Sequence, residues 1–112
     1  MKILMLILKH VDLTNQIIHR LAESGVKGGT IIDGTGMANA LLNMEDLPMF
    51  GMLRHILADD DKEMCKIMMF VLEDDQIDET KKIIRQVIGD LNKPNTGIMF
   101  SIPIMDVEGL GE

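Results

Sequence analysis

The amino-acid sequence predicts one α+β domain, built from two β-α-β units with a long irregular segment between them. Four apolar stretches are short enough to be strands, and two other segments repeat apolar residues at helical spacing. The chain has 112 residues, which suits a single domain over residues 1–112 and leaves little room for a second. The order β-α-β, long loop, β-α-β is typical of the ferredoxin-like split βαβ fold (βαββαβ).

The first unit begins with an apolar stretch that predicts a buried strand over Met1–Lys9. Asp12 is expected to cap the following helix, because its carboxylate can accept hydrogen bonds from the free amides of the first turn. Apolar residues then recur at helical spacing, which predicts a helix over about Leu13–Ser24 that ends at Gly25. The apolar stripe of this helix consists of Leu13, Ile17, Ile18 and Leu21.

The second strand is expected over Gly28–Asp33, and the glycines Gly34 and Gly36 predict a tight turn directly after it. From Met37 to about Asp61 no clean period persists. Loops of this length inside compact domains are usually functional or disordered, so this segment is the first place to expect a partner protein. Short helical pieces are expected within it, at Ala38–Leu42 and Met49–Leu57.

The second unit begins with another apolar strand, expected over Met64–Glu73. Asp75 is expected to cap the second helix, since carboxylates are favoured at helix N-termini. The segment Asn92–Gly97 predicts a loop, and the last strand is expected over Ile98–Met105. The apolar stripe of the second helix consists of Ile77, Ile84, Val87, Ile88 and Leu91.

The predicted strands are apolar on both sides. Both helices of this fold pack on one face of the sheet, so the other face of a monomer should be polar. Exposing a second apolar face would leave a large patch that soluble monomers avoid, and the sequence therefore predicts a closed homo-oligomer. The alternating sets are Ile3, Met5 and Ile7 against Leu4, Leu6 and Leu8, and Ile67, Met69 and Val71 against Met68, Phe70 and Leu72.

Composition excludes several classes of function. Eleven basic against 18 acidic residues give a net charge of −7, which argues against a nucleic-acid surface, and only 3% of residues are aromatic, too few for base stacking. The apolar run Ile3–Leu8 is much shorter than the roughly 20 residues of a membrane-spanning helix and lacks the features of a signal peptide. We therefore expect a cytoplasmic location, with no nucleic acid bound and no insertion into membranes.

Residues that could support catalysis or metal binding are few. Cys65 is the single cysteine, which excludes an internal disulfide, and its apolar strand predicts a buried, inert thiol. His10, His19 and His55 have no paired acid at motif spacing, and no zinc-ligand or dinucleotide motif is present. We therefore expect no enzymatic activity, no catalytic residue and no metal site. The run Asp59–Asp61 is interpreted as a solvated loop, with a divalent-cation site as the alternative.

Two segments resemble the nitrogen-regulatory PII signalling proteins. Gly25–Ile32 (GVKGGTII) is similar to the end of the first helix and the second strand of that family, and Thr96–Ile104 (TGIMFSIPI) is similar to its B-loop and final strand. Gly34 and Gly36 stand where the family enters its long T-loop. The resemblance covers the length and element order of the whole chain. It implies a homotrimer whose sheets face a common centre, with adenine nucleotides bound in the clefts between subunits.

The resemblance also implies which residues line such a cleft. Ile98 stands where the family usually has a lysine, and Lys93 lies near enough to substitute for it. The family's basic residues after the last strand are missing, and the chain has no tyrosine that could be uridylylated. One side of the cleft would be formed by Thr30, Gly34, Gly36 and Met37, and the other by Lys93, Asn95, Thr96 and Gly97.

The function implied is that of a PII-like regulatory protein without catalysis. Its effector would be an adenine nucleotide (ATP, ADP or AMP), another small molecule, or none, since lost cations weaken polyphosphate binding. The loop at about residues 37–61 would contact a partner, such as a membrane transporter or a metabolic enzyme. The alternatives are a trimeric metal-binding protein of the cation-tolerance type and a small cofactor-free ferredoxin-like enzyme.

Overall fold

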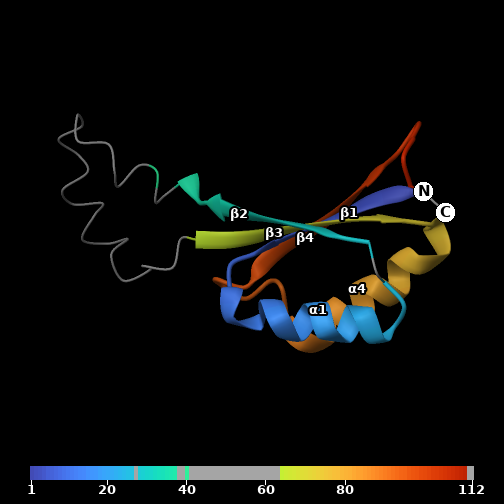
Figure 1. Ribbon diagram of the computed structural model, residues 1–112. Helices are drawn as coiled ribbons and strands as arrows, with labels where there is room; N and C mark the ends of the chain where they lie inside the picture. The colour runs from blue at the N-terminus through green and yellow to red at the C-terminus, as the bar shows by residue number, and fades with distance from the viewer. Residues whose placement is uncertain (27, 38–39, 41–63, 111–112) are drawn as a thin grey trace, which may run out of the picture.

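The computed structural model describes residues 1–26, 28–37, 40 and 64–110, and these form an α+β fold (Figure 1). Two helices and four strands follow one another in the expected order. The elements are β1 (Lys2–Leu8), the 3₁₀ helix η1 (Val11–Leu13), α1 (Thr14–Glu23), β2 (Thr30–Thr35), β3 (Met64–Leu72), α4 (Asp74–Ile88) and β4 (Gly97–Pro103).

The four strands form one antiparallel sheet in the order β2-β3-β1-β4. The central strands are therefore β3 and β1, and β2 and β4 are the two edges. Both helices lie on the same side of the sheet (Figure 1). This topology is compatible with the predicted ferredoxin-like fold.

The core lies between the helices and one face of the sheet. Leu4, Leu6 and Leu8 of β1 are fully buried, and their register partners Phe70 and Met68 on β3 point to the same side. Each such side chain contributes roughly 1.5–3 kcal/mol by leaving water. The other buried members of this core are Ile17, Leu21, Leu72, Ile77, Ile83 and Ile84.

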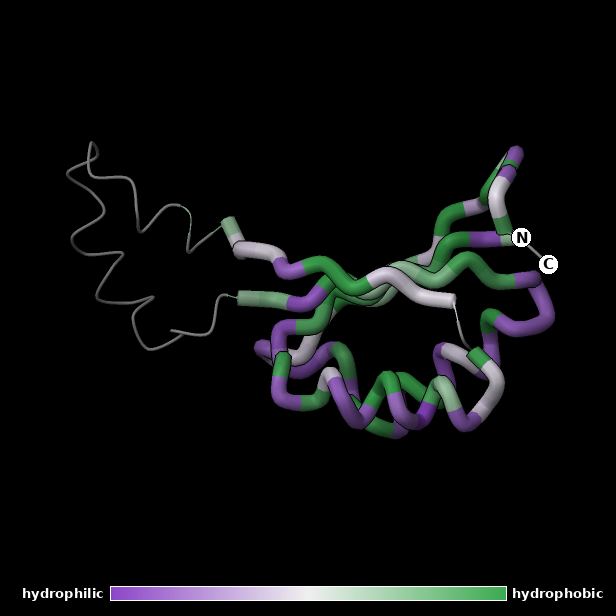
Figure 2. The backbone as a smooth tube through the Cα atoms, in the orientation of Figure 1, coloured by the Kyte–Doolittle hydropathy of each residue, from purple (hydrophilic) through white to green (hydrophobic). Residues whose placement is uncertain are grey.

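Among the described residues, no helix covers the opposite face of the sheet, here called the open face (Figure 1). The register places thirteen positions on this face, and none of them carries a charged side chain. The predicted division of β1 and β3 into two apolar sets, one on each face of the sheet, is thereby confirmed. Figure 2 shows the apolar character of the sheet along its strands. The open face consists of Ile3, Met5, Ile7, Thr30, Ile32, Gly34, Cys65, Ile67, Met69, Val71, Ile98, Phe100 and Ile102.

Both predicted helix caps are wrong. Asp12 lies inside η1, and α1 begins two residues later, with Leu13 as its N-cap and no capping side chain. Thr14 instead donates from its hydroxyl to the carbonyl of Val11 at 2.6 Å, which joins η1 to α1. The second helix is capped by Glu73, whose backbone amide donates to Oε1 of Gln76 at 3.1 Å. Asp75 therefore lies in the first turn of α4 and does not cap it.

The end of α1 is as predicted. Gly25 has a φ of 96°, a conformation that favours glycine. The amides of Gly25 and Val26 donate to the carbonyls of Ala22 and Leu21, which closes the last turn of the helix.

The bounds of the second strand differ from the prediction. It starts at Thr30 and continues through Gly34 to Thr35, because its pairing with β3 runs on to Met64. The turn predicted at Gly34 is therefore absent. A Cβ at position 34 would lie 2.8 Å from Sγ of Cys65, so this glycine provides space for the neighbouring side chain.

The other strands end earlier than predicted. β3 ends at Leu72, because Glu73 begins the next helix, and β4 spans Gly97–Pro103. The amide of Ile104 donates to the carbonyl of Met1 at 3.1 Å, just after β4 ends. The loop predicted at residues 92–97 is present up to Thr96. Within the described ranges, no helix is long and apolar enough to cross a membrane.

Candidate functional site

The predicted site residues fall into two groups on different strands. Thr30 and Gly34 belong to β2, and Gly36 and Met37 follow directly after it. The amide of Ala40 donates to the carbonyl of Gly36 at 3.0 Å, a helical hydrogen bond just past β2. The remaining residues of the expected helical pieces at 38–42 and 49–57, and nearly all of the loop at 37–61, lie outside the described residues.

The second group lies at the other edge of the sheet. Gly97 is the first residue of β4, and Lys93, Asn95 and Thr96 belong to the loop before it. The register pairs Gly97 with Leu8 at the end of β1.

Gly34, Gly36 and Met37 lie at the same end of the sheet as the second group, whereas Thr30 pairs with Met69 on β3, level with Met5 in the middle of β1. Leu8 pairs with Lys66 on β3, and the neighbouring Cys65 pairs with Gly34 on β2. Three strand spacings separate β2 from β4, which is about 14 Å at about 4.8 Å per spacing. Within one chain the two groups therefore lie on opposite edges of the sheet.

The loop before β4 is held by its own hydrogen bonds. The hydroxyl of Thr96 lies 2.9 Å from the carbonyl of Leu91 and 2.8 Å from that of Lys93, and can donate to either. Asn95 has a φ of 63°, in the left-handed region that asparagine tolerates. The hydroxyl proton of Thr96 is therefore used within the loop, and this side chain could meet a ligand only as an acceptor.

Gly97 is required by the close approach of β4 to β1. Its φ is 156°, and a Cβ there would lie 2.7 Å from the carbonyl oxygen of Ile7. The packing of the sheet alone therefore explains a glycine at position 97, because any other residue would press against the backbone of β1.

The turn after β1 joins this group, which the sequence did not indicate. The carbonyl of Thr96 accepts hydrogen bonds from the amides of Lys9 and His10, at 3.1 and 3.4 Å. Lys9 and Lys93 are both exposed on segments that meet at Thr96. No pattern in the sequence links these two lysines, because 83 intervening residues separate them.

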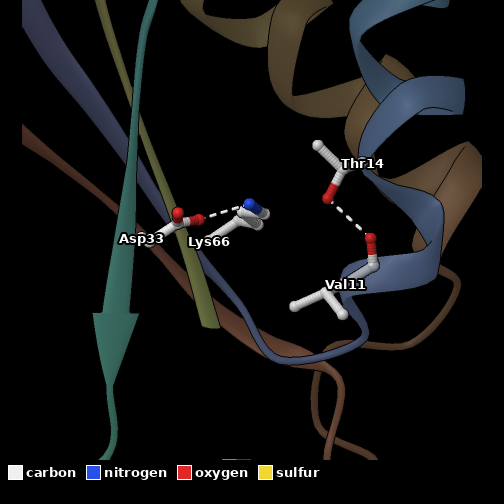
Figure 3. Close-up of polar contacts among 4 residues, drawn as sticks. All are labelled: Val11, Thr14, Asp33 and Lys66. Atoms are coloured by element: carbon white, nitrogen blue, oxygen red, sulfur yellow. Dashed lines mark hydrogen bonds and ion pairs between the residues drawn. The ribbon is translucent and has the colours of Figure 1, made fainter. Parts of the chain in front are cut away.

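A third lysine near this end of the sheet is already paired. Lys66 forms an ion pair with Asp33, its register partner across β2 and β3 (Figure 3). The pair lies near Val11 and Thr14, on the side of the sheet that carries the helices (Figure 3). The carboxylate of Asp33 therefore offsets the charge of Lys66, and this lysine adds little to the attraction of an anion.

The described histidines and the cysteine belong to different parts of the fold: His10 follows β1, His19 lies in α1 and Cys65 lies in β3. Nε2 of His19 forms an exposed pair with Glu23 at 2.6 Å, one helical turn along α1, although the sequence predicts no paired acid for this histidine. Cys65 is buried on the open face, as predicted for an inert thiol, although its partner there is Gly34. No group of three or more potential metal ligands occurs among residues 1–26, 28–37, 40 and 64–110. His55 and Asp59–Asp61 lie outside the described residues.

Comparisons with known proteins add no family assignment. No protein-family model matches the chain, and no curated protein is similar to it.

Proposed function

We propose that this chain is a PII-like regulatory protein that assembles as a homotrimer and binds a small effector between subunits. The observation that carries the proposal is the open face, where thirteen positions on four strands include no charged side chain. Three of its large side chains are strongly exposed in the single chain, Ile32 and Ile102 at 44% and Ile98 at 54%. Covering this face with further copies removes a patch that soluble monomers avoid.

The placement of the two residue groups supports a site between subunits. Apart from Thr30, the two groups lie at one end of the sheet but on opposite edges, so a single chain offers each half without its complement. In a cyclic assembly, the β2 edge of one copy can lie beside the β4 edge of the next. Such an arrangement would bring Gly36 and Met37 of one copy toward Lys93 and Asn95 of its neighbour.

The charges around the site favour an effector with few negative charges. Lys66 is paired with Asp33, and the position after Gly97 is the apolar Ile98. Lys9 and Lys93 are exposed lysines on the segments that meet at Thr96, where His10 is exposed as well. Two lysines can form charge-assisted hydrogen bonds to one phosphate group, and the further phosphates of ADP and ATP would then lack basic partners. We therefore expect AMP to bind better than ADP or ATP. The loop at residues 37–61 would then report occupancy to a partner protein.

Sedimentation velocity and calorimetry with AMP, ADP and ATP test this proposal. We expect a species of three 12.5 kDa chains and a binding heat that is largest for AMP. A single 12.5 kDa species at working concentration would overturn the assembly, and tight ATP binding would overturn the charge argument. A melting temperature raised by divalent cations and by no nucleotide would favour the cation-tolerance alternative.

Gly36→Val tests the place of the site within the trimer. The added side chain stands where the chain leaves β2, so it should abolish the nucleotide heat and leave the sedimentation of the trimer unchanged. The matched control is Gly28→Val, because a Cβ at Gly28 meets nothing within 4 Å. Equal nucleotide binding by both variants would remove Gly36 from the site.

A further inference from the structure

We draw no further inference here: the strongest candidate, the exposed side-chain cluster of Lys9, His10 and Lys93 where the turn after β1 meets the loop before β4, belongs to the candidate site already described.

Discussion

Glycines in this chain serve different purposes that only the structure separates. Gly34 and Gly36 look alike in the sequence, yet Gly34 lies within β2 and gives room to Sγ of Cys65. Gly97 lies where β4 meets the backbone of β1. The sequence shows that a glycine is present at each position, but the residue that it must make room for is distant in the chain. Local sequence patterns therefore do not identify that neighbour.

Gly97→Ala should destabilise the fold by about 1–3 kcal/mol, because the new Cβ would lie 2.7 Å from the carbonyl oxygen of Ile7. Urea unfolding followed by circular dichroism measures this change. Gly28→Ala is the control, since nothing lies within 4 Å of its Cβ, and its free energy of unfolding should change by less than about 0.5 kcal/mol. Equal stability of the two variants would show that β4 can move away from β1 at no cost.

Asp74 links the start of the chain to the second helix and gives stability a dependence on pH. Its carboxylate lies 3.0 Å from the amino group of Met1, whose hydrogen bond and positive charge lower the pKa of Asp74 below its ordinary 3.8. The contribution of this contact is therefore present above about pH 4 and is lost as the pH falls through the lowered pKa.

Carboxyl chemical shifts recorded by NMR across an acid titration should give a pKa for Asp74 below 3.8. Acetylation of the Met1 amine should return the pKa toward its ordinary value, because the acetylated chain carries no positive charge there. An identical pKa for Asp74 with and without acetylation would exclude the contact in solution.

At the scale of elements, the periodic patterns predicted the helices and strands, and the caps escaped prediction. The stripe residues Ile17, Leu21, Ile77 and Ile84 are buried as expected, but Ile18 is 38% exposed and Leu91 lies beyond the end of α4. Asp12 and Asp75 are the expected caps because carboxylates favour helix N-termini. The real starts depend on η1 and on the point where β3 ends, and both are set by tertiary packing.

Gln76→Ala should lower the free energy of unfolding by about 0.5–1 kcal/mol, because Oε1 of Gln76 accepts a hydrogen bond from the amide of Glu73. Gln16→Ala is a matched control. It is also exposed and is the third residue of its helix, but α1 has no side-chain cap. Alanine has a higher helix propensity than glutamine, so propensity alone should not destabilise either variant. Denaturant titration measures both variants, and equal changes in their free energy of unfolding would show that the hydrogen bond from Glu73 to Gln76 adds nothing.

At the scale of the whole molecule, the strand pattern predicts which segments carry the candidate site residues and not the order of the strands in the sheet. Thr30 lies in β2 as expected, whereas Gly97, expected in the loop, is the first residue of β4, and the order β2-β3-β1-β4 sets the two on opposite edges. The link from Lys9 to Thr96 joins segments far apart in the chain. Such contacts come from the packing of the sheet, on which local spacing carries no information.

Phe100→Glu should separate the subunits without unfolding the chain. Phe100 lies on the open face and is 37% exposed in the single chain, so its replacement costs the isolated fold little and places a charge in the proposed interface. Ile18→Glu is the matched control, because Ile18 is 38% exposed but belongs to α1, on the other side of the sheet. Light scattering coupled to size exclusion should find Phe100→Glu at 12.5 kDa and Ile18→Glu at the mass of the wild type. If both variants keep the wild-type mass, the open face does not hold the copies together; if both become smaller, the effect of the charge is not specific to that face.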